Sequence, residues 1–229
     1  MNIRNTAIVA ALLSAAAAVP ATAQVAGIAT SDTSVAIARS KALGTAYQQI
    51  GTQYTAVAQQ MQTKRQEINT LNAQLDTNKD KELTQAELDV AIKAKSPVLA
   101  QIDAKQKEIN TLQDPIILAQ LFAVEQIAMK YEAAQQAVIT AKRINVILAP
   151  DAFVWAPESV DVTAAITAEL DKAVPSVPIT PPAGWRPSRQ IGQLYQQIQQ
   201  LINVAAQQAQ AAAARPPAPA TPAAQPDSR

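Results

Sequence analysis

The chain has 229 residues, carries 19 Lys and Arg against 18 Asp and Glu, and contains neither cysteine nor histidine. The missing thiol and imidazole groups exclude disulfides, cysteine nucleophiles, Ser-His triads and zinc sites built from Cys and His. The balanced charge gives no reason to expect nucleic acid as a partner, and few aromatic side chains are available to line a catalytic cleft, so we expect no enzyme.

The first 23 residues have the pattern of an export signal. Arg4 is their one charged residue, the run from Ala7 to Val19 is apolar apart from Ser14, and small residues close the segment at Ala23. The apolar run is too short to span a membrane, and no second run follows it. We therefore expect cleavage before Gln24 and a mature chain in the periplasm, without stable insertion into a membrane.

Residues 34–142 are expected to form a long helical arm, because the chain has only five glycines and is rich in Ala and Gln. From Tyr47 to Leu75 apolar residues recur at alternating steps of three and four, and Lys64 takes one position of this stripe. A stripe this narrow favours a coiled coil over an amphipathic helix packed on a globular core.

A second helical stretch begins near Pro97 and runs to about residue 143, with Pro115 expected to kink it or to mark a join. The sequence Glu-Ile-Asn-Thr-Leu occurs at residues 67–71 and again at residues 108–112. This repeat is either chance in a biased sequence or the sign of an antiparallel hairpin that folds back near residue 90. Two helices alone bury too little for a core, so such an arm would need copies of itself or a partner.

Residues 24–33 and 143–175 are expected to form a small β-rich body. The runs "INVILA" and "AFVWA", residues 144–149 and 152–156, are rich in β-branched and aromatic residues and are separated by a Pro-Asp turn pair. They predict a hairpin or two adjacent strands next to a first strand at residues 27–30. The alternating pattern places Trp155 in the core beneath these strands.

A short helix is expected after the strands, capped by Asp161 and followed by a proline-rich linker at residues 176–187. Within the linker, Trp185 is either a docking anchor or simply exposed. Residues 188–214 predict one more amphipathic helix, and the Pro/Ala-rich tail at 215–229 has almost nothing to bury and is expected to be disordered.

The stretch "DTNKDKELTQAE", residues 76–87, partly matches an EF-hand calcium loop. Its expected calcium ligands are Asp76, Asn78 and Asp80 through side-chain oxygens, Glu82 through its carbonyl, Thr84 through water, and Glu87 through both carboxylate oxygens. Lys81 stands where the template has glycine for a positive φ. The alternative is a polar tip whose next helix is capped by Thr84 and Glu87, with no cofactor required.

The order of strand, long helical excursion, strands and helix resembles the Skp/OmpH family of periplasmic chaperones over about residues 26–174. The residues that carry the resemblance are "INVILAPDAFVWAPESVDVTAAI", in which Asp161-Val162-Thr163 matches the family's helix start. The resemblance implies a mainly α fold with a small β-sheet body (α+β), from which a helical hairpin projects, in a jellyfish-like homotrimer.

The same resemblance implies that the cavity between the arms holds unfolded outer-membrane β-barrel proteins without ATP and keeps them from aggregating. As client contacts we expect soft or aromatic side chains exposed on the arm, namely Tyr47, Tyr54, Met61, Met129 and Tyr131. Family members are strongly basic, and this near-neutral chain gives no ground for carrying over lipopolysaccharide binding. Two alternatives stay open: a calcium-binding periplasmic protein and a coiled-coil spacer of the envelope.

Overall fold

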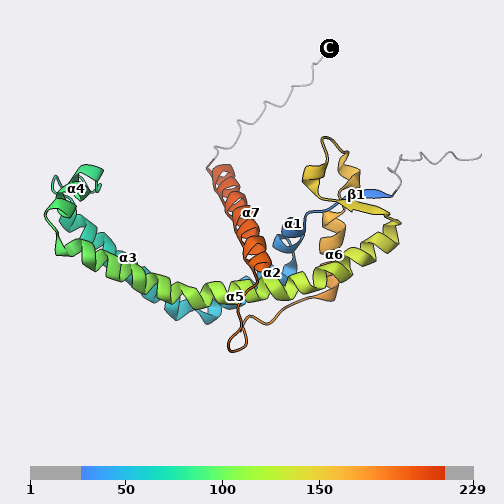
Figure 1. Cartoon of the computed structure of the whole chain (residues 1–229), viewed down its shortest axis with the longest axis horizontal. Helices are drawn as coiled ribbons and strands as arrows, with labels where there is room; N and C mark the ends of the chain where they lie inside the picture. Colours follow the sequence, from blue (N-terminus) through green and yellow to red (C-terminus); the bar gives the residue numbers. More distant parts are fainter. Residues whose placement is uncertain (1–26, 215–229) are drawn as a thin grey trace, which may run out of the picture.

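The computed structural model describes residues 27–214, which are mainly helical with one small sheet (Figure 1). The predicted mainly α fold with a small β body is thereby confirmed. The predicted export signal (1–23) and the predicted disordered tail (215–229) lie outside the described residues. Among the helices of the described part, none is both long and apolar enough to cross a membrane.

The sheet joins the two ends of the long helical excursion. Strand β1 (Ile28–Thr30) pairs in parallel with β2 (Val146–Leu148), so that Ile28 lies opposite Val146. Gly27 precedes β1 with φ +80, and a Cβ there would collide with the side chain of Asn145. The Gly27 carbonyl accepts hydrogen bonds from the N–H groups of Asn145 and Val146, and these bonds fix the register of β1 and β2.

The predicted third strand at residues 152–156 does not form, so the expectation of two adjacent strands after residue 144 is wrong. Pro150–Ala152 is a single 3₁₀ turn (η1), and the N–H of Phe153 donates to the carbonyl of Pro150. This hydrogen bond turns the chain away from β2 before a ladder can begin, and Pro157, which has no N–H, ends the segment. The run therefore adds no strand to the sheet, which consists of β1 and β2 in the described part of the chain.

Three helices follow β1. Helix α1 (Thr33–Ala38) is capped by Asp32, α2 (Lys41–Gln53) is capped by Ser40, and α3 (Thr55–Leu75) starts directly after α2. The predicted stripe from residue 47 to 75 suggested one continuous helix, but the structure interrupts it at Tyr54. Hydroxyl groups of threonines on both sides of the break bond to carbonyls one turn earlier, a pattern that bends helices.

The chain then reverses through a tip that contains α4 (Gln85–Lys93) and returns along α5 (Pro97–Lys142). Pro97 stands in the first turn of α5, where its missing N–H costs nothing. Pro115 lies exposed inside α5, and the helix continues through it. Helix α3 and the first half of α5 run side by side along the arm (Figure 1).

The two copies of the repeated sequence lie opposite each other in this arm. Lys64 Nζ is 2.8 Å from Glu108 Oε2, and Lys105 Nζ is 2.8 Å from Glu67 Oε2. Each lysine also lies near the glutamate three residues after it in its own helix, at 3.5 and 3.7 Å. The hydrogen bond from Lys105 lowers the pKa of Glu67, and the bond to Glu108 raises the pKa of Lys64. The glutamate that opens each copy and the lysine three residues before it thus form an alternating square of charge, which we call the charge square.

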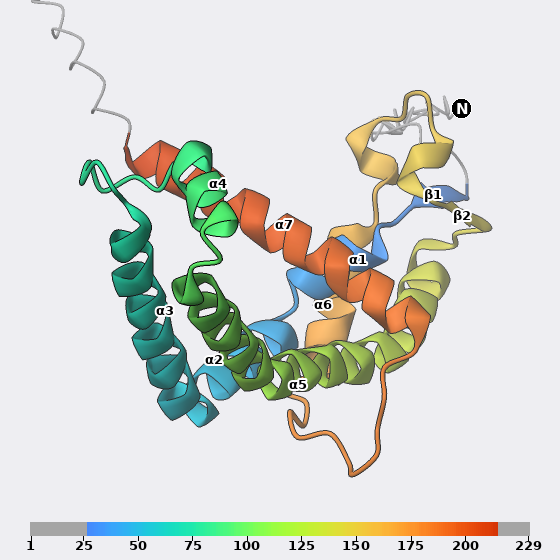
Figure 2. The same cartoon turned by 60° about the vertical axis from the view of Figure 1, so that its left-hand side comes forward.

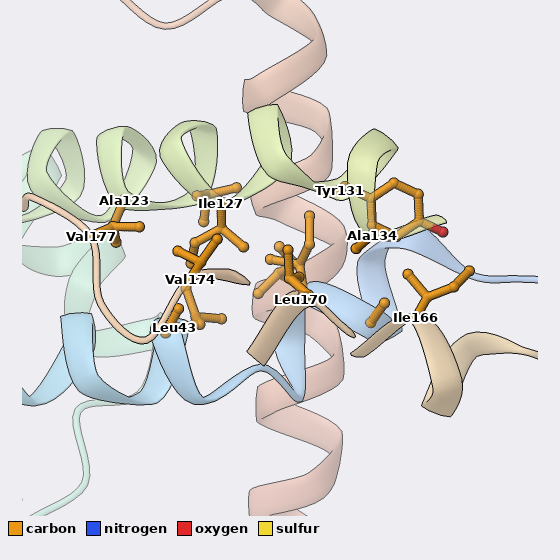
Figure 3. Close-up of a cluster of buried hydrophobic side chains, with 14 of the residues drawn as sticks. Leu43, Ala123, Ile127, Tyr131, Ala134, Ile166, Leu170, Val174 and Val177 are labelled. Atoms are coloured by element: carbon orange, nitrogen blue, oxygen red, sulfur yellow. The ribbon is translucent and has the colours of Figure 1, made fainter. Parts of the chain in front are cut away.

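The main core lies where the body meets the root of the arm (Figure 3). It packs α1 and α2 against the second half of α5, α6 (Thr163–Ala173) and α7 (Arg189–Ala213). Its fully buried large side chains are Ile37, Leu43, Val124, Ile127, Ile166, Leu170 and Ile198. Burial of such side chains contributes about 1.5–3 kcal/mol each relative to exposure, which makes this cluster the main source of stability.

The helix start at Asp161-Val162-Thr163 ties α6 to both β1 and α1. A 3₁₀ turn, η2 (Glu158–Val160), precedes it, and the Val162 N–H then donates to the carbonyl of Thr30. Asp161 accepts from the N–H of Thr163 at 2.8 Å, while the Thr163 hydroxyl accepts from the N–H of Asp32 at 3.0 Å. The aspartate and the threonine of the motif therefore each satisfy a backbone donor at a helix start.

Candidate functional site

Glu87 closes the tip of the arm. One carboxylate oxygen accepts from the N–H groups of Thr77 and Asn78 and from the Thr77 hydroxyl, and the other accepts from the N–H and hydroxyl of Thr84. The Thr84 oxygen in turn accepts from the N–H of Glu87, which completes a capping box at the start of α4. The bonds from Thr84, followed by those from Thr77, hold the pKa of Glu87 at about 2.

The other acidic side chains of the loop also bond to backbone donors. Asp76 accepts from the N–H groups of Lys79 and Lys81, at 2.6 and 2.8 Å, and Asp80 accepts from the N–H of Glu82 at 2.8 Å. Asn78 accepts from the N–H of Asp80. Lys81 adopts φ +71, the left-handed backbone that the sixth position of a calcium loop requires.

These side chains do not converge as a metal site. Within residues 27–214, no group of three or more His, Cys, Asp or Glu side chains is placed to hold a metal ion. Both oxygens of Glu87 and both of Asp76 are already engaged by N–H or O–H donors, so the arrangement fits a self-closed cap and not a calcium cage. Calcium binding through Asp76, Asn78, Asp80, Glu82, Thr84 and Glu87 stays a prediction.

The five side chains expected to contact clients are exposed to very different degrees. Met129 is open to solvent, with 59% of its surface exposed, and Tyr47 and Tyr54 are half-buried. Met61 and Tyr131 are each only 8% exposed. The premise that all five are exposed is therefore wrong for Met61, which packs inside the arm, and for Tyr131, which packs in the core and donates to Ser31.

Helical periodicity cannot separate such residues. The stripe that carries Met61 is the face that α3 turns toward α5, and Tyr131 lies on the face of α5 that covers α1 and α6. A residue on an apolar stripe is buried wherever a partner helix exists. Burial of Tyr47 under its neighbours raises the pKa of its phenol.

The body carries a set of exposed apolar side chains that the sequence did not predict. Its members come from both strands and from the loop after β2: Ile28, Val146, Leu148, Val154 and Trp155. Trp155 is 80% exposed, so its predicted place in the core is wrong. The available signal was the same β-branched and aromatic run, which is equally consistent with a surface covered by another chain. We call this set the body patch.

The tip has a smaller apolar surface on α4. Val90 and Ile92 are 59% and 58% exposed, whereas Ala91 between them is buried. Together with Met129 they give the arm a few separate apolar contacts and no continuous hydrophobic groove.

The C-terminal segment wraps around the root of the arm (Figure 2). Residues 174–188, which we call the strap, pass below α5, and α7 then crosses α5 on its other face. Trp185 is anchored: its ring packs edge-on against Phe122 with centroids 5.2 Å apart, and its N–H donates to Glu125 at 2.8 Å. Of the two readings left open for Trp185, the docking anchor is the one that the structure supports.

Comparison with known proteins gives one family. The sequence model of the family described as "Outer membrane protein (OmpH-like)" matches residues 27–170, which is more than half of the chain and includes the body and the arm. Among curated proteins, none matches.

A solved structure of a candidate outer membrane chaperone (OmpH-like) from Caulobacter crescentus CB15 is 19% identical. The alignment covers 69% of this chain and 90% of that chain, with a TM-score of 0.44.

Proposed function

Because the chain belongs to the OmpH-like family of outer membrane proteins, we propose that it is a periplasmic chaperone that holds unfolded outer-membrane β-barrel proteins without ATP and prevents their aggregation. The observation that carries the proposal is that the family match spans the whole unit of body and arm. A spacer would need the arm alone, whereas here the chain builds a separate body at the root.

The surface of the arm suits weak and repeated contacts with many clients. Met129, Val90 and Ile92 are exposed at separate places, and each offers a small apolar area. At about 25 cal/mol per Å² of buried apolar surface, single contacts of this size are weak, and only several together retain an unfolded chain. Methionine is flexible and polarizable, so it adapts to different partners.

The direct test is light scattering of a urea-unfolded outer-membrane barrel diluted into buffer with the mature chain. We expect suppression of aggregation at near-stoichiometric ratios, without nucleotide. The variant Met129→Gln should require more chaperone for the same suppression, whereas the neighbouring exposed Lys130→Gln should match the parent chain. If aggregation proceeds unchanged when the chain is in excess, the holdase function is rejected and the envelope spacer becomes the favoured hypothesis.

We further propose that the protein is a homotrimer assembled through the body patch. The described part of one chain leaves this apolar set open to solvent beside a two-stranded sheet, and a sheet of two strands is marginal without further packing. Copies of the chain that cover the patch would supply that packing.

Calcium binding is the second candidate function, and the left-handed backbone of Lys81 is the observation in its favour. An ion would have to displace the donors that now occupy Glu87 and Asp76. The scattering experiment, run once with calcium and once with chelator, tests it together with a calorimetric titration. Heat of binding that is lost in Asp80→Asn would support the ion site, and a titration without heat of binding would reject it. Equal scattering with calcium and with chelator would show that the chaperone does not depend on the ion.

A further inference from the structure

Helix α7 lies outside the family match and yet contributes to the core. The match ends at residue 170, whereas Val174, Val177 and Ile198 belong to the buried cluster. Ile198 is completely buried, and Leu194, Tyr195 and Ile202 are partly buried against the same cluster. The helix therefore occupies a groove formed by α1, α2 and α5, which we call the α7 groove.

The rim of the α7 groove is polar but carries no ion pair to α7. The Tyr195 hydroxyl donates to Gln120 on α5 at 2.7 Å, and the Gln199 side chain donates to the Tyr47 hydroxyl on α2 at 2.8 Å. Burial raises the pKa of both tyrosines, so each phenol remains a neutral partner at physiological pH. Helix α7 thus contacts the groove through aliphatic side chains in the centre and through neutral amide and phenol groups at the edge.

The sequence of α7 matches this chemistry along its whole length. After Arg189 the helix contains no charged residue up to its end, and its polar positions are almost all Gln. Ile191, Leu194 and Ile198 repeat at steps of three and four and give one apolar face. The groove therefore accommodates an uncharged segment with aliphatic or aromatic residues on one side and amides on the other.

Only the first part of α7 is docked. Beyond Ile202 every described residue of the helix is exposed, including Val204 at 51%, and Leu201 is 36% exposed. This distal part projects away from α5, on the side toward which the arm curves (Figure 1). A helix held through about half of its length, by apolar contacts and neutral hydrogen bonds, can exchange with a competitor of the same chemistry.

We propose that α7 is a displaceable internal ligand, and that the α7 groove binds uncharged amphipathic segments of a client once α7 has left it. The inference rests on the proposed chaperone function for its client, but the groove itself is defined by contacts within this chain. The strap, anchored by Trp185 on Phe122 and Glu125, keeps the released helix near its groove, so that release of the client lets α7 return.

The experiment compares the full chain with α7 free and with α7 locked. Ile198→Gln weakens docking at its centre, and Tyr195→Phe with Gln199→Ala removes only the two rim hydrogen bonds. Val204→Gln makes the same aliphatic-to-amide change on the exposed part and is the matched control. Because the chain has no native cysteine, Gln120→Cys with Tyr195→Cys can be locked by a short bis-maleimide.

The first probe is a fluorescent peptide of residues 188–214, measured by anisotropy. We expect at least tenfold tighter binding to Ile198→Gln than to the parent chain, intermediate binding to the rim variant, parent-like binding to Val204→Gln, and none to the locked form. If Ile198→Gln does not fold, as judged by a far-UV spectrum that differs from that of the parent chain, the peptide binding of Tyr195→Phe with Gln199→Ala tests the inference instead. Equal binding to free and locked forms overturns the inference.

The second probe is the unfolded barrel in the scattering assay, which separates the inference from the function on which it rests. We expect the released variants to suppress aggregation at a lower ratio than the locked form. Equal suppression by both keeps the chaperone and overturns the role of α7, whereas peptide binding without any suppression keeps the groove and overturns the chaperone. Loss of oligomer mass in the released variants would place α7 in the groove of a neighbouring copy, which also overturns the proposal.

Discussion

Glu87 holds two segments of the tip together with a single carboxylate. Its oxygens accept from Thr77 at the beginning of the loop and from Thr84 at the start of α4, so the side chain acts as a clamp across ten residues. A carboxylate that accepts several N–H and O–H bonds is stabilised in its ionised form, which is the cause of its low pKa.

The clamp gives the tip a defined pH dependence. The pKa of Glu87 falls from 4.5 to about 2 on folding, so its contribution to stability is complete above pH 4.5 and is lost as the pH falls toward about 2. We expect the Glu87 carboxyl to titrate near pH 2 by NMR, and Glu87→Gln to remove the difference in α4 amide protection between neutral and acidic pH. The exposed Glu82→Gln is the control, and a Glu87 midpoint near 4.5 would contradict the clamp.

Leu170 is the residue that we choose to test the stability of the core. It is completely buried between α6 and α5, whereas Leu201 on α7 is 36% exposed. Removing a buried leucine side chain leaves a cavity, so Leu170→Ala should lower the free energy of unfolding by about 2–5 kcal/mol. Leu201→Ala should cost less than about 1 kcal/mol. Urea unfolding followed by circular dichroism measures both free energies. Equal losses of stability in the two variants would show that Leu170 is not part of the main core.

At the scale of elements, the charge square sets how α3 and α5 meet. The four side chains are between 26% and 46% exposed, so solvent and salt screen their charges. We therefore expect these ion pairs to fix the alignment of α3 against α5 and to add little to the free energy of unfolding. The register of two Gln-rich helices is otherwise weakly specified, because many alignments bury similar side chains.

Charge reversal tests this role of the square. Lys64→Glu places three carboxylates around Lys105 and should lower the melting temperature of the arm, with the loss shrinking at high salt. Reversing all four members, Lys64→Glu and Lys105→Glu with Glu67→Lys and Glu108→Lys, restores every opposite pair and should recover the parent behaviour. A fourfold variant as unstable as the single one would show that the square does not set the register.

For the whole molecule, the exposed apolar side chains of the body patch suggest burial against another copy of the chain. Trp155 is the aromatic member of this set, and aromatic side chains contribute much of the free energy of binding when an interface buries them. In a Trp185→Phe background, Trp155 fluorescence should shift to shorter wavelength as protein concentration rises through assembly. Trp155→Ser should weaken the oligomer in sedimentation experiments, and the exposed Asp151→Ser should not. A concentration-independent spectrum and an unchanged mass would reject assembly through the body patch.

Most features that depend on neighbours along the chain could be derived from the amino-acid order alone. The repeat steps of three and four, the N-cap Asp32, the capping box of Thr84 and Glu87, and the bond from the Thr163 N–H to Asp161 all act within a few residues, although the N-cap of α6 is Val162 and not Asp161. Local hydrogen bonds and propensities decide such features, so the helical arm, the tip and the family could be predicted without a structure.

Which apolar residues are covered depends on contacts between distant parts of the chain. The same kind of periodic pattern leads to burial for Met61 and Tyr131 and to exposure for Met129, because the outcome depends on which helix lies opposite each position. The run at 152–156 has the propensity of a strand, but the 3₁₀ turn at Pro150–Ala152 leads the chain away from β2, and Trp155 stays exposed. Likewise, α7 reads as an independent amphipathic helix, and its groove exists only where α1, α2 and α5 come together from distant parts of the sequence.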